Sequence, residues 1–464
     1  MVDVVLNDHG IKQGSPDPYL PQDVLDTVID ILGNEWLSCS QDEDARDALC
    51  KCMLVSRAFF VRARKHIFER LYRSYERREP VTARDVEFFG ASPGSPSPNG
   101  LGVLPPKAFL REVNIVFDNS KSHEKRIRKR LAHLYTLLTM EGVVSTQLKT
   151  FFFQAVGQYH LRAALLEFIP AICSSTSTTM LRFSHIDDFP MAALSHCTNL
   201  RWLSLIDVWP KTREDLTNTD LVVTWNEEGF CNLTSLQIDS SEFCMAVLPQ
   251  AAFKNEKAFT RIEEVDFVVN GGVSGEPILQ EFEIIRRARN TLEHLSIDVI
   301  HFGADETDED LAESGTFDLS CFPRLTLLEF KCSLKTHEPF TKRFSSLFTG
   351  LHSPSTIHTM NLTIFFEGPP YDADKDHPIP LTADWAALDD ILVNRSVFPR
   401  LTFLDFRFMI LVIYRPLEGM DYRRLAVHQS RMHTLAAMKR FAKSVFPKVA
   451  RCPLIKDQRA YEVR

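Results

Sequence analysis

The stretch LRWLSL, residues 200–205, carries leucines at its first, fourth and sixth positions. The same spacing of three hydrophobic residues recurs with starts at residues 200, 233, 262, 292, 325 and 357, so that successive starts lie 33, 29, 30, 33 and 32 residues apart. Such a regular period indicates stacked structural repeats. The clearest copies are Leu200-Leu203-Leu205, Leu233-Leu236-Ile238, Ile262-Val265-Phe267, Leu292-Leu295-Ile297, Leu325-Leu328-Phe330 and Ile357-Met360-Leu362.

Each copy predicts a short strand whose alternate side chains point into a shared core, followed by a segment that returns the chain to the next strand. Residues 121–140 predict a helix with one hydrophobic face, formed by Ile127, Leu131, Leu134 and Leu138. Residues 435–445 predict a helix that caps the C-terminal end. The fold class expected is therefore α/β. Additional copies of the triplet are Leu110-Val113-Ile115, Leu148-Phe151-Phe153 and Leu401-Leu404-Phe406.

Residues 107–450 resemble the leucine-rich-repeat family in an irregular form, in which the asparagine expected after each strand is usually absent. The resemblance implies a solenoid of parallel strands with helical or irregular return segments, and a concave face that binds a protein substrate. The alternative is an α/β globular domain with short hydrophobic strands. Trp202 is either an exposed interface anchor or a packed residue of an irregular coil. The candidates for substrate contact are Trp202, Ser204, Gln237 and His294, with Thr234, Ser296, Thr326 and Glu329 at similar positions.

Residues 90–106 contain four glycines, five prolines and three serines. This composition cannot bury enough hydrophobic surface to order itself, so it predicts a linker between an N-terminal module and the repeats.

The N-terminal module opens with Leu20-Pro21, a pair that favours a helix start, and Asp23 lies where the helix dipole favours a carboxylate. Gly33 is expected to end this helix. Its hydrophobic stripe is too wide for an isolated surface helix, so the helix needs a partner. The stripe consists of Val24, Leu25, Val28, Ile29, Ile31 and Leu32.

A second helical pattern follows the polar segment 38–47, and it is hydrophobic on two neighbouring faces. A unit of about fifty residues is too small to bury both faces in its own core. We therefore expect the surplus to bind another protein. One face carries Leu49, Cys52, Met53, Ser56, Phe60, Ala63 and Ile67, and the other carries Leu54, Val55, Ala58 and Val61.

Residues 19–72 resemble the F-box family in the order and spacing of these hydrophobic residues, although the segment 33–47 is longer and more acidic than usual. The resemblance implies docking on the Skp-type adaptor of a cullin ubiquitin ligase. The alternative is a helical hairpin that caps the following domain. The residues expected to contact the adaptor are Leu20, Pro21, Val24, Leu25, Ile29, Leu32, Leu54, Val55 and Phe59.

Composition narrows the classes of function. The formal net charge of −8 argues against a nucleic-acid-binding body, although residues 423–464 carry eleven basic residues against Asp457 and Glu462. We interpret that basic segment as a solvated helix face. The alternative is a patch for an acidic partner or nucleic acid. No secretory signal or membrane span is evident, and the ten scattered cysteines fit reduced core residues of a cytoplasmic or nuclear protein.

No catalytic motif, metal-ligand spacing or phosphate-binding loop is recognisable, so no catalytic residue, metal or cofactor is expected. The acidic run at 305–310 lacks the ligand spacing of a calcium loop. The two resemblances together imply a substrate-recognition subunit of a cullin-based ubiquitin ligase. Two alternatives remain, a repeat scaffold without a role in ubiquitylation and an enzyme with an unrecognised active site.

Overall fold

The computed structural model describes residues 21–38, 43–73, 108–118, 124–139, 147–156, 161–210, 225–239, 254–271, 283–302, 319–335, 354–368, 383–412 and 446–463, with Cys244, Val247, Leu248, Gln250 and Ala251. The chain divides into two compact units: the first comprises residues 1–72 and 83–113, the second residues 73–82 and 114–464. The expected module at 19–72 falls in the first unit. The expected linker at 90–106 and capping helix at 435–445 lie outside the described residues.

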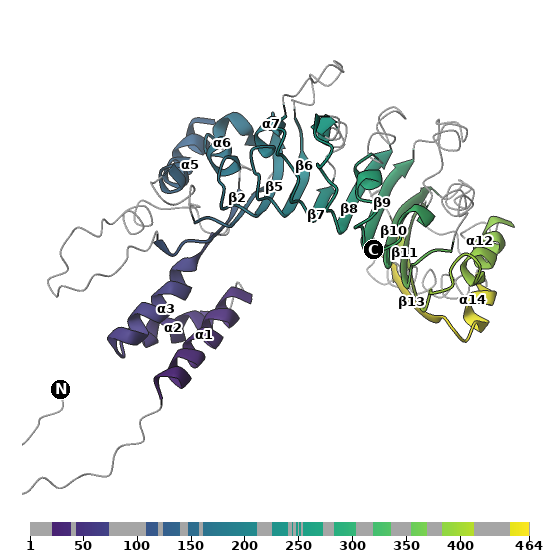
Figure 1. The fold of residues 1–464 in the computed structure, drawn as a ribbon, viewed down its shortest axis with the longest axis horizontal. Helices are drawn as coiled ribbons and strands as arrows, with labels where there is room; N and C mark the ends of the chain where they lie inside the picture. Colours follow the sequence, from purple (N-terminus) through teal and green to yellow (C-terminus); the bar gives the residue numbers. More distant parts are fainter. Residues whose placement is uncertain are drawn as a thin grey trace, which may run out of the picture. The chain divides into compact units, whose positions relative to one another are not determined.

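The first unit contains three mutually packed helices, α1 (Gln22–Ser38), α2 (Glu43–Cys52) and α3 (Arg57–Glu69), and α3 runs directly into β1 (Arg70–Arg73) (Figure 1). We call α1 to α3 the three-helix module. Its core is small: Ile29, Leu49 and Ala63 are buried at its centre, one from each helix. Partly buried side chains surround them, namely Leu32, Cys52, Met53, Phe59 and Ile67.

Two expectations for the module are wrong. The second helical pattern is two helices, because a turn at residues 53–55 ends α2 and Ser56 caps α3 by accepting a hydrogen bond from the Phe59 amide at 3.3 Å. Gly33 does not end α1, which continues to Ser38. Gly33 instead leaves room for His66 of α3, since a Cβ built on Gly33 would lie 2.3 Å from His66 Cγ.

We expect Gly33→Ala to destabilise the module. In an ordinary helix interior this change stabilises by about 0.5–1 kcal/mol, but here the clash with the buried His66 ring reverses the sign, and overpacking costs about 1–3 kcal/mol. Hydrogen exchange of the α1 and α3 amides in the full chain should accelerate. A Gly33→Ala, His66→Ala double variant removes the clash and serves as the control. Unchanged or slower exchange in the single variant would contradict the predicted clash.

The second unit is built on one sheet with the order β2-β3-β5-β6-β7-β8-β9-β10-β11-β12-β13, and β4 pairs with β5 (Figure 1). The pairs β3/β5 and β4/β5, and every neighbouring pair from β5 to β13, are parallel. The strands are β2 (Glu112–Asp118), β3 (Thr150–Val156), β4 (Leu161–Arg162), β5 (Met180–Asp187), β6 (Trp202–Val208), β7 (Ser235–Asp239), β8 (Glu264–Gly271), β9 (His294–Phe302), β10 (Leu327–Lys335), β11 (Thr359–Gly368), β12 (Phe403–Val412) and β13 (Lys456–Val463).

Short helices follow several strands of the second unit. The helix α5 (Glu124–Thr139) has the hydrophobic face expected from the sequence, because Ile127, Leu131, Leu134 and Leu138 are all buried. Further helices among the described residues include η2 (Ala163–Leu165), α6 (Ile169–Cys173), α7 (Met191–Leu194), η4 (Leu319–Cys321), α12 (Ala383–Val393) and α14 (Pro447–Arg451). The α/β class is therefore confirmed.

The core lies along one face of this sheet, and the hydrophobic triplets build it. Every residue of the six clearest triplets is buried, as are those of the three additional copies. Strand register places like positions side by side, so that Leu203 pairs with Leu236, Leu236 with Val265 and Val265 with Leu295. Aromatic rings extend the same core, for example Phe151 against Phe168 at 5.6 Å between ring centroids. Each copy of the triplet thus contributes one strand to the sheet.

Polar side chains also join successive repeats, at the position just before several of the triplets. The Asn199 and Asn232 amides donate to the carbonyls of Thr176 and Thr198 in the preceding repeat, at 2.6 and 2.9 Å. The Thr291 hydroxyl donates likewise to the Ile262 carbonyl at 2.7 Å. These bonds satisfy carbonyls that the parallel ladder leaves unpaired at its edge.

Candidate protein-interaction sites

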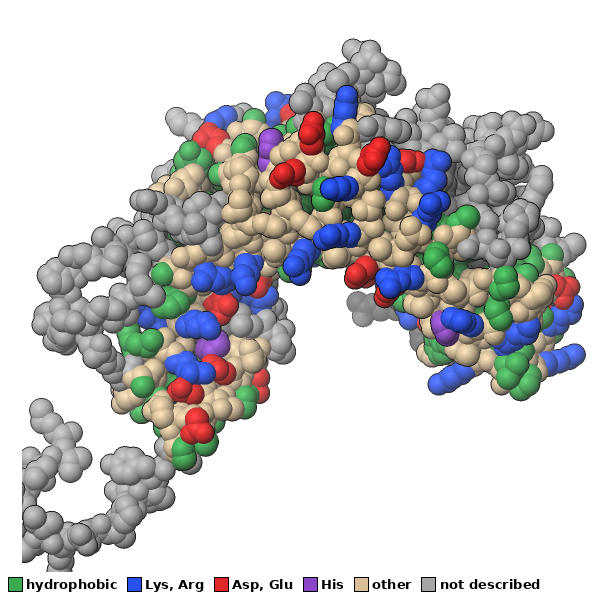
Figure 2. All heavy atoms as spheres, viewed as in Figure 1, with side chains coloured by type: hydrophobic (Ala, Val, Ile, Leu, Met, Phe, Trp, Pro, Cys, Tyr) green, Lys and Arg blue, Asp and Glu red, His purple; other side chains and the backbone are tan. Residues whose placement is uncertain are grey.

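The three-helix module exposes hydrophobic side chains that its own core does not use. Val24, Val28 and Ile31 of α1 are 41%, 49% and 52% exposed. Their spacing of four and three residues places them on one side of the helix. Leu54 and Val55 are 87% and 67% exposed in the turn between α2 and α3, and Val61 of α3 is also exposed. We call these six residues the apolar surface of the module; Figure 2 shows hydrophobic side chains at the surface of this module, next to charged ones.

The turn that carries Leu54 and Val55 is held by its own backbone. The Leu54 amide donates to the Lys51 carbonyl at 3.0 Å and the Val55 amide to the Cys52 carbonyl at 3.2 Å. The Ser56 cap follows at once. The backbone thus holds two large hydrophobic side chains in contact with water. Burying each of them would provide about 1.5–3 kcal/mol of stabilisation. This is the pattern of a binding surface.

The expected adaptor contacts divide into groups in the structure. Pro21, Val24, Leu54 and Val55 are exposed, whereas Leu25, Leu32 and Phe59 are only partly exposed. Ile29 is corrected: its side chain is 1% exposed because it fills the centre of the module's own core, so it cannot contact a partner. Leu20 lies outside the described residues.

Sequence reasoning left Val28, Ile31 and Val61 out of the contact set. The available signal was their helical spacing, but that spacing alone does not say which side of a wide stripe faces the core.

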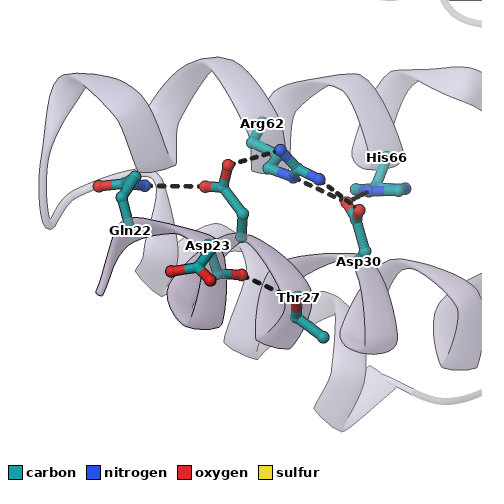
Figure 3. A network of polar contacts seen from close by, with 7 residues as sticks. Gln22, Asp23, Thr27, Asp30, Arg62 and His66 are labelled. Atoms are coloured by element: carbon teal, nitrogen blue, oxygen red, sulfur yellow. Dashed lines mark hydrogen bonds and ion pairs between the residues drawn. The ribbon is translucent and has the colours of Figure 1, made fainter. Parts of the chain in front are cut away.

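A polar network joins α1 to α3, and Figure 3 shows its side chains converging between the two helices. Arg62 donates from Nε and Nη2 to the two oxygens of Asp30, at 2.9 and 2.5 Å, and from Nη1 to Asp26 at 2.6 Å. His66 Nε2 donates to Asp30 Oδ1 at 2.8 Å. The paired hydrogen bonds between a guanidinium and a carboxylate fix the relative positions of the helices.

Acid should weaken this network. Hydrogen bonds from Arg62 and then His66 hold the pKa of Asp30 well below its ordinary value of 3.8. Because this folded-state pKa is lowered, the stabilisation is complete above about pH 4, the pKa of an unfolded aspartate, and is lost as the pH falls further. The Asp30 side chain is 40% exposed, so solvent screens part of the effect.

We expect Asp30→Asn to lower the urea midpoint of the module's helices at pH 7 and to reduce the difference between the midpoints at pH 7 and pH 3. Circular dichroism of the full chain measures both. Asp44→Asn removes the same charge from α2 and is the control. Equal pH dependence in the Asp30→Asn variant and the wild type would contradict the predicted role of Asp30.

The second candidate site is the sheet face opposite the core, which we call the polar face. Strand register arranges its residues in rows. The first row contains Trp202, Ser235, Glu264 and His294, and the second contains Ser204, Gln237, Asp266, Ser296 and Glu329. The structure therefore brings together the four substrate-contact candidates, which come from three strands and are separated by up to about ninety residues of sequence.

Side-chain hydrogen bonds run across the rows. The Ser204 hydroxyl donates to Gln237 Oε1 at 2.8 Å, and Gln237 Nε2 donates to Asp266 Oδ2 at 3.3 Å. Glu264 accepts from the Ser235 hydroxyl at 3.1 Å and lies 3.3 Å from His294 Nδ1. Adjacent repeats are thus coupled through their side chains on the polar face as well as through the ladder.

The candidates differ in how much of each side chain faces solvent. Ser204 is corrected as a contact residue, because its side chain is fully buried and bonded to Gln237. Trp202, Gln237 and His294 are partly exposed. The Trp202 ring packs 5.4 Å from the Phe152 ring, between centroids, so it is a partly packed aromatic rather than a free-standing one.

Thr234 and Thr326 stand just before their strands, outside the rows. Their hydroxyls donate to the Arg201 and Glu293 carbonyls of the preceding repeat, at 3.0 and 3.2 Å. They are repeat-joining residues.

Other classes of site receive little support from the described residues. Within them, no group of three or more His, Cys, Asp or Glu residues could hold a metal ion, and no cysteine forms a disulfide bond. No helix in the described ranges is long and apolar enough to cross a membrane. The acidic run at 305–310 lies outside them. When the sequence is compared with protein-family models and with curated proteins, no match is found.

Proposed function

We propose that this protein is a non-catalytic recognition subunit with two binding surfaces. In this proposal the three-helix module is an F-box that docks on a Skp-type adaptor, and through it on a cullin. The repeats form an irregular leucine-rich-repeat solenoid whose polar face binds a protein substrate. The protein would act in the cytoplasm or nucleus.

One observation carries the docking half of the proposal: the module completes its own core and, among the side chains that the structure describes, still exposes six large hydrophobic ones. These side chains come from α1, from the turn before α3 and from α3, all within one small unit. A single partner could therefore contact several of them. Two bodies bound to one chain meet at a raised effective concentration, and this alone would promote transfer of ubiquitin to the bound substrate. No catalytic group in this chain is required.

Co-expression tests the docking half directly. The full chain, carrying an affinity tag, is expressed with a Skp-type adaptor and purified, and we expect the adaptor to co-purify at a one-to-one ratio. Failure to co-purify would overturn the docking proposal. A reconstituted cullin ligase then separates the ubiquitin-ligase role from a simple scaffold: ubiquitylation of a captured partner supports the former, and capture without ubiquitylation supports the latter.

A further inference from the structure

The polar face carries a concentration of negative charge at its centre. On β7 to β10, its described residues include five carboxylates, and Lys331 of β10 lies among them. Lys331 is in register with Asp298 and offsets part of this charge. The carboxylates are Asp239, Glu264, Asp266, Asp298 and Glu329.

Unpartnered polar atoms lie in the same place. Ser296 is 3% exposed, yet its hydroxyl has no hydrogen-bond partner. Its register partner Asp266 has a second oxygen, Oδ1, that is buried without a partner, and so is Nε2 of His294, two residues before Ser296. Leaving a buried polar group unpaired costs about 1–3 kcal/mol. Three such atoms on two adjacent strands indicate a site whose hydrogen bonds are completed by a ligand.

The electrostatics favour a cation. Burial raises the pKa of Asp298, and the neighbouring carboxylates Asp239 and Asp266 raise it further, against the opposing effect of Lys331. Carboxylates that repel one another across strands are stabilised when a positive group binds among them. His294 and Glu264, whose side chains are 29% and 51% exposed, keep the cluster in contact with solvent.

We propose that the centre of the polar face, from β7 to β10, binds a protein segment that carries arginine or lysine side chains. This inference names the substrate class for the recognition surface proposed above, and so rests on that function. A guanidinium suits this acidic cluster, because it offers five donors and no acceptor. Four strands about 4.8 Å apart span roughly 15 Å, the length of about five extended residues.

A peptide-binding experiment tests the inference on the full chain. The probe is a fluorescein-labelled peptide of three Arg-Gly repeats, with three Glu-Gly repeats as the opposite charge, and fluorescence anisotropy measures binding. We expect only the basic peptide to bind. The double variant Asp266→Asn, Asp298→Asn should weaken binding by about tenfold or more, because it removes two central carboxylates.

The matched control is Glu227→Gln, Glu228→Gln, which removes the same charge from exposed residues outside the rows. We expect less than about a twofold change for it. No binding by the wild type, or equal weakening in both double variants, would overturn the inference. The adaptor experiment is independent of this one: peptide binding without adaptor capture rejects only the docking half, and adaptor capture without peptide binding rejects only the substrate class.

Discussion

Replacing Leu54 and Val55 together by serine should abolish capture of the Skp-type adaptor while leaving the module folded. Among the large hydrophobic residues of the module whose side chains the structure describes, these two are the most exposed, and they lie on a turn whose backbone is already hydrogen-bonded. Truncation of a central interface residue typically costs about 2 kcal/mol or more, and each 1.4 kcal/mol is tenfold in affinity. Two such losses amount to about 4 kcal/mol, so the double substitution should weaken binding by roughly several hundred-fold.

The measurement is co-purification followed by titration calorimetry with the purified adaptor. Leu454→Ser is the matched control, because Leu454 is similarly exposed, at 63%, but belongs to the second unit. Exposed substitutions change stability by only about 0.5 kcal/mol, so circular dichroism of the variant should match that of the wild type. Full adaptor affinity in a folded Leu54→Ser, Val55→Ser protein would mean that this turn is not part of the docking surface.

Phe151→Ala should destabilise the second unit far more than Phe152→Ala, although the two residues are neighbours. Phe151 is fully buried, with its ring against those of Phe168 and Phe183. Removing such a ring costs about 3–5 kcal/mol. Phe152 lies on the polar face, where its ring packs against that of Trp202, and such a pair is worth about 1 kcal/mol.

Urea unfolding of the full chain, followed by tryptophan fluorescence, measures the difference, and hydrogen exchange of the β3 and β5 amides locates it. Phe152→Ala is the internal control, because it removes the same number of atoms from the same strand. Similar destabilisation by both substitutions would reject the strand orientation that places Phe151 in the core.

The success of the sequence-based prediction in the second unit has a physical cause. A triplet with its second and third members two residues apart fits only a strand, because alternate residues of a strand share a face. With a period of about 30 residues, the segment after each strand returns the chain so that the next strand lies beside the previous one. The burial of Leu203, Leu236 and Val265 in one row follows from those two spacings.

In the first unit, spacing along the chain does not determine which hydrophobic residues are buried. The hydrophobic stripe of α1 is wider than the face that a small core can cover, so the sequence gives no reason to prefer Ile29 over Val28 as the buried residue. That choice depends on where Leu49 and Ala63 lie, and both come from other helices. Gly33 is similar: glycine is a common helix terminator, but its role here is set by the His66 ring from α3.

The sequence by itself therefore determined the α/β class, the parallel succession of strands and the surplus of hydrophobic residues at the N-terminus. These depend on spacing along the chain, which local geometry converts into structure. Only the tertiary structure decided which of those hydrophobic residues remain on the surface, and that the carboxylates Asp239, Asp266 and Asp298 gather with an unpaired serine on one face. Both depend on register and packing between segments distant in sequence, and no local pattern encodes them.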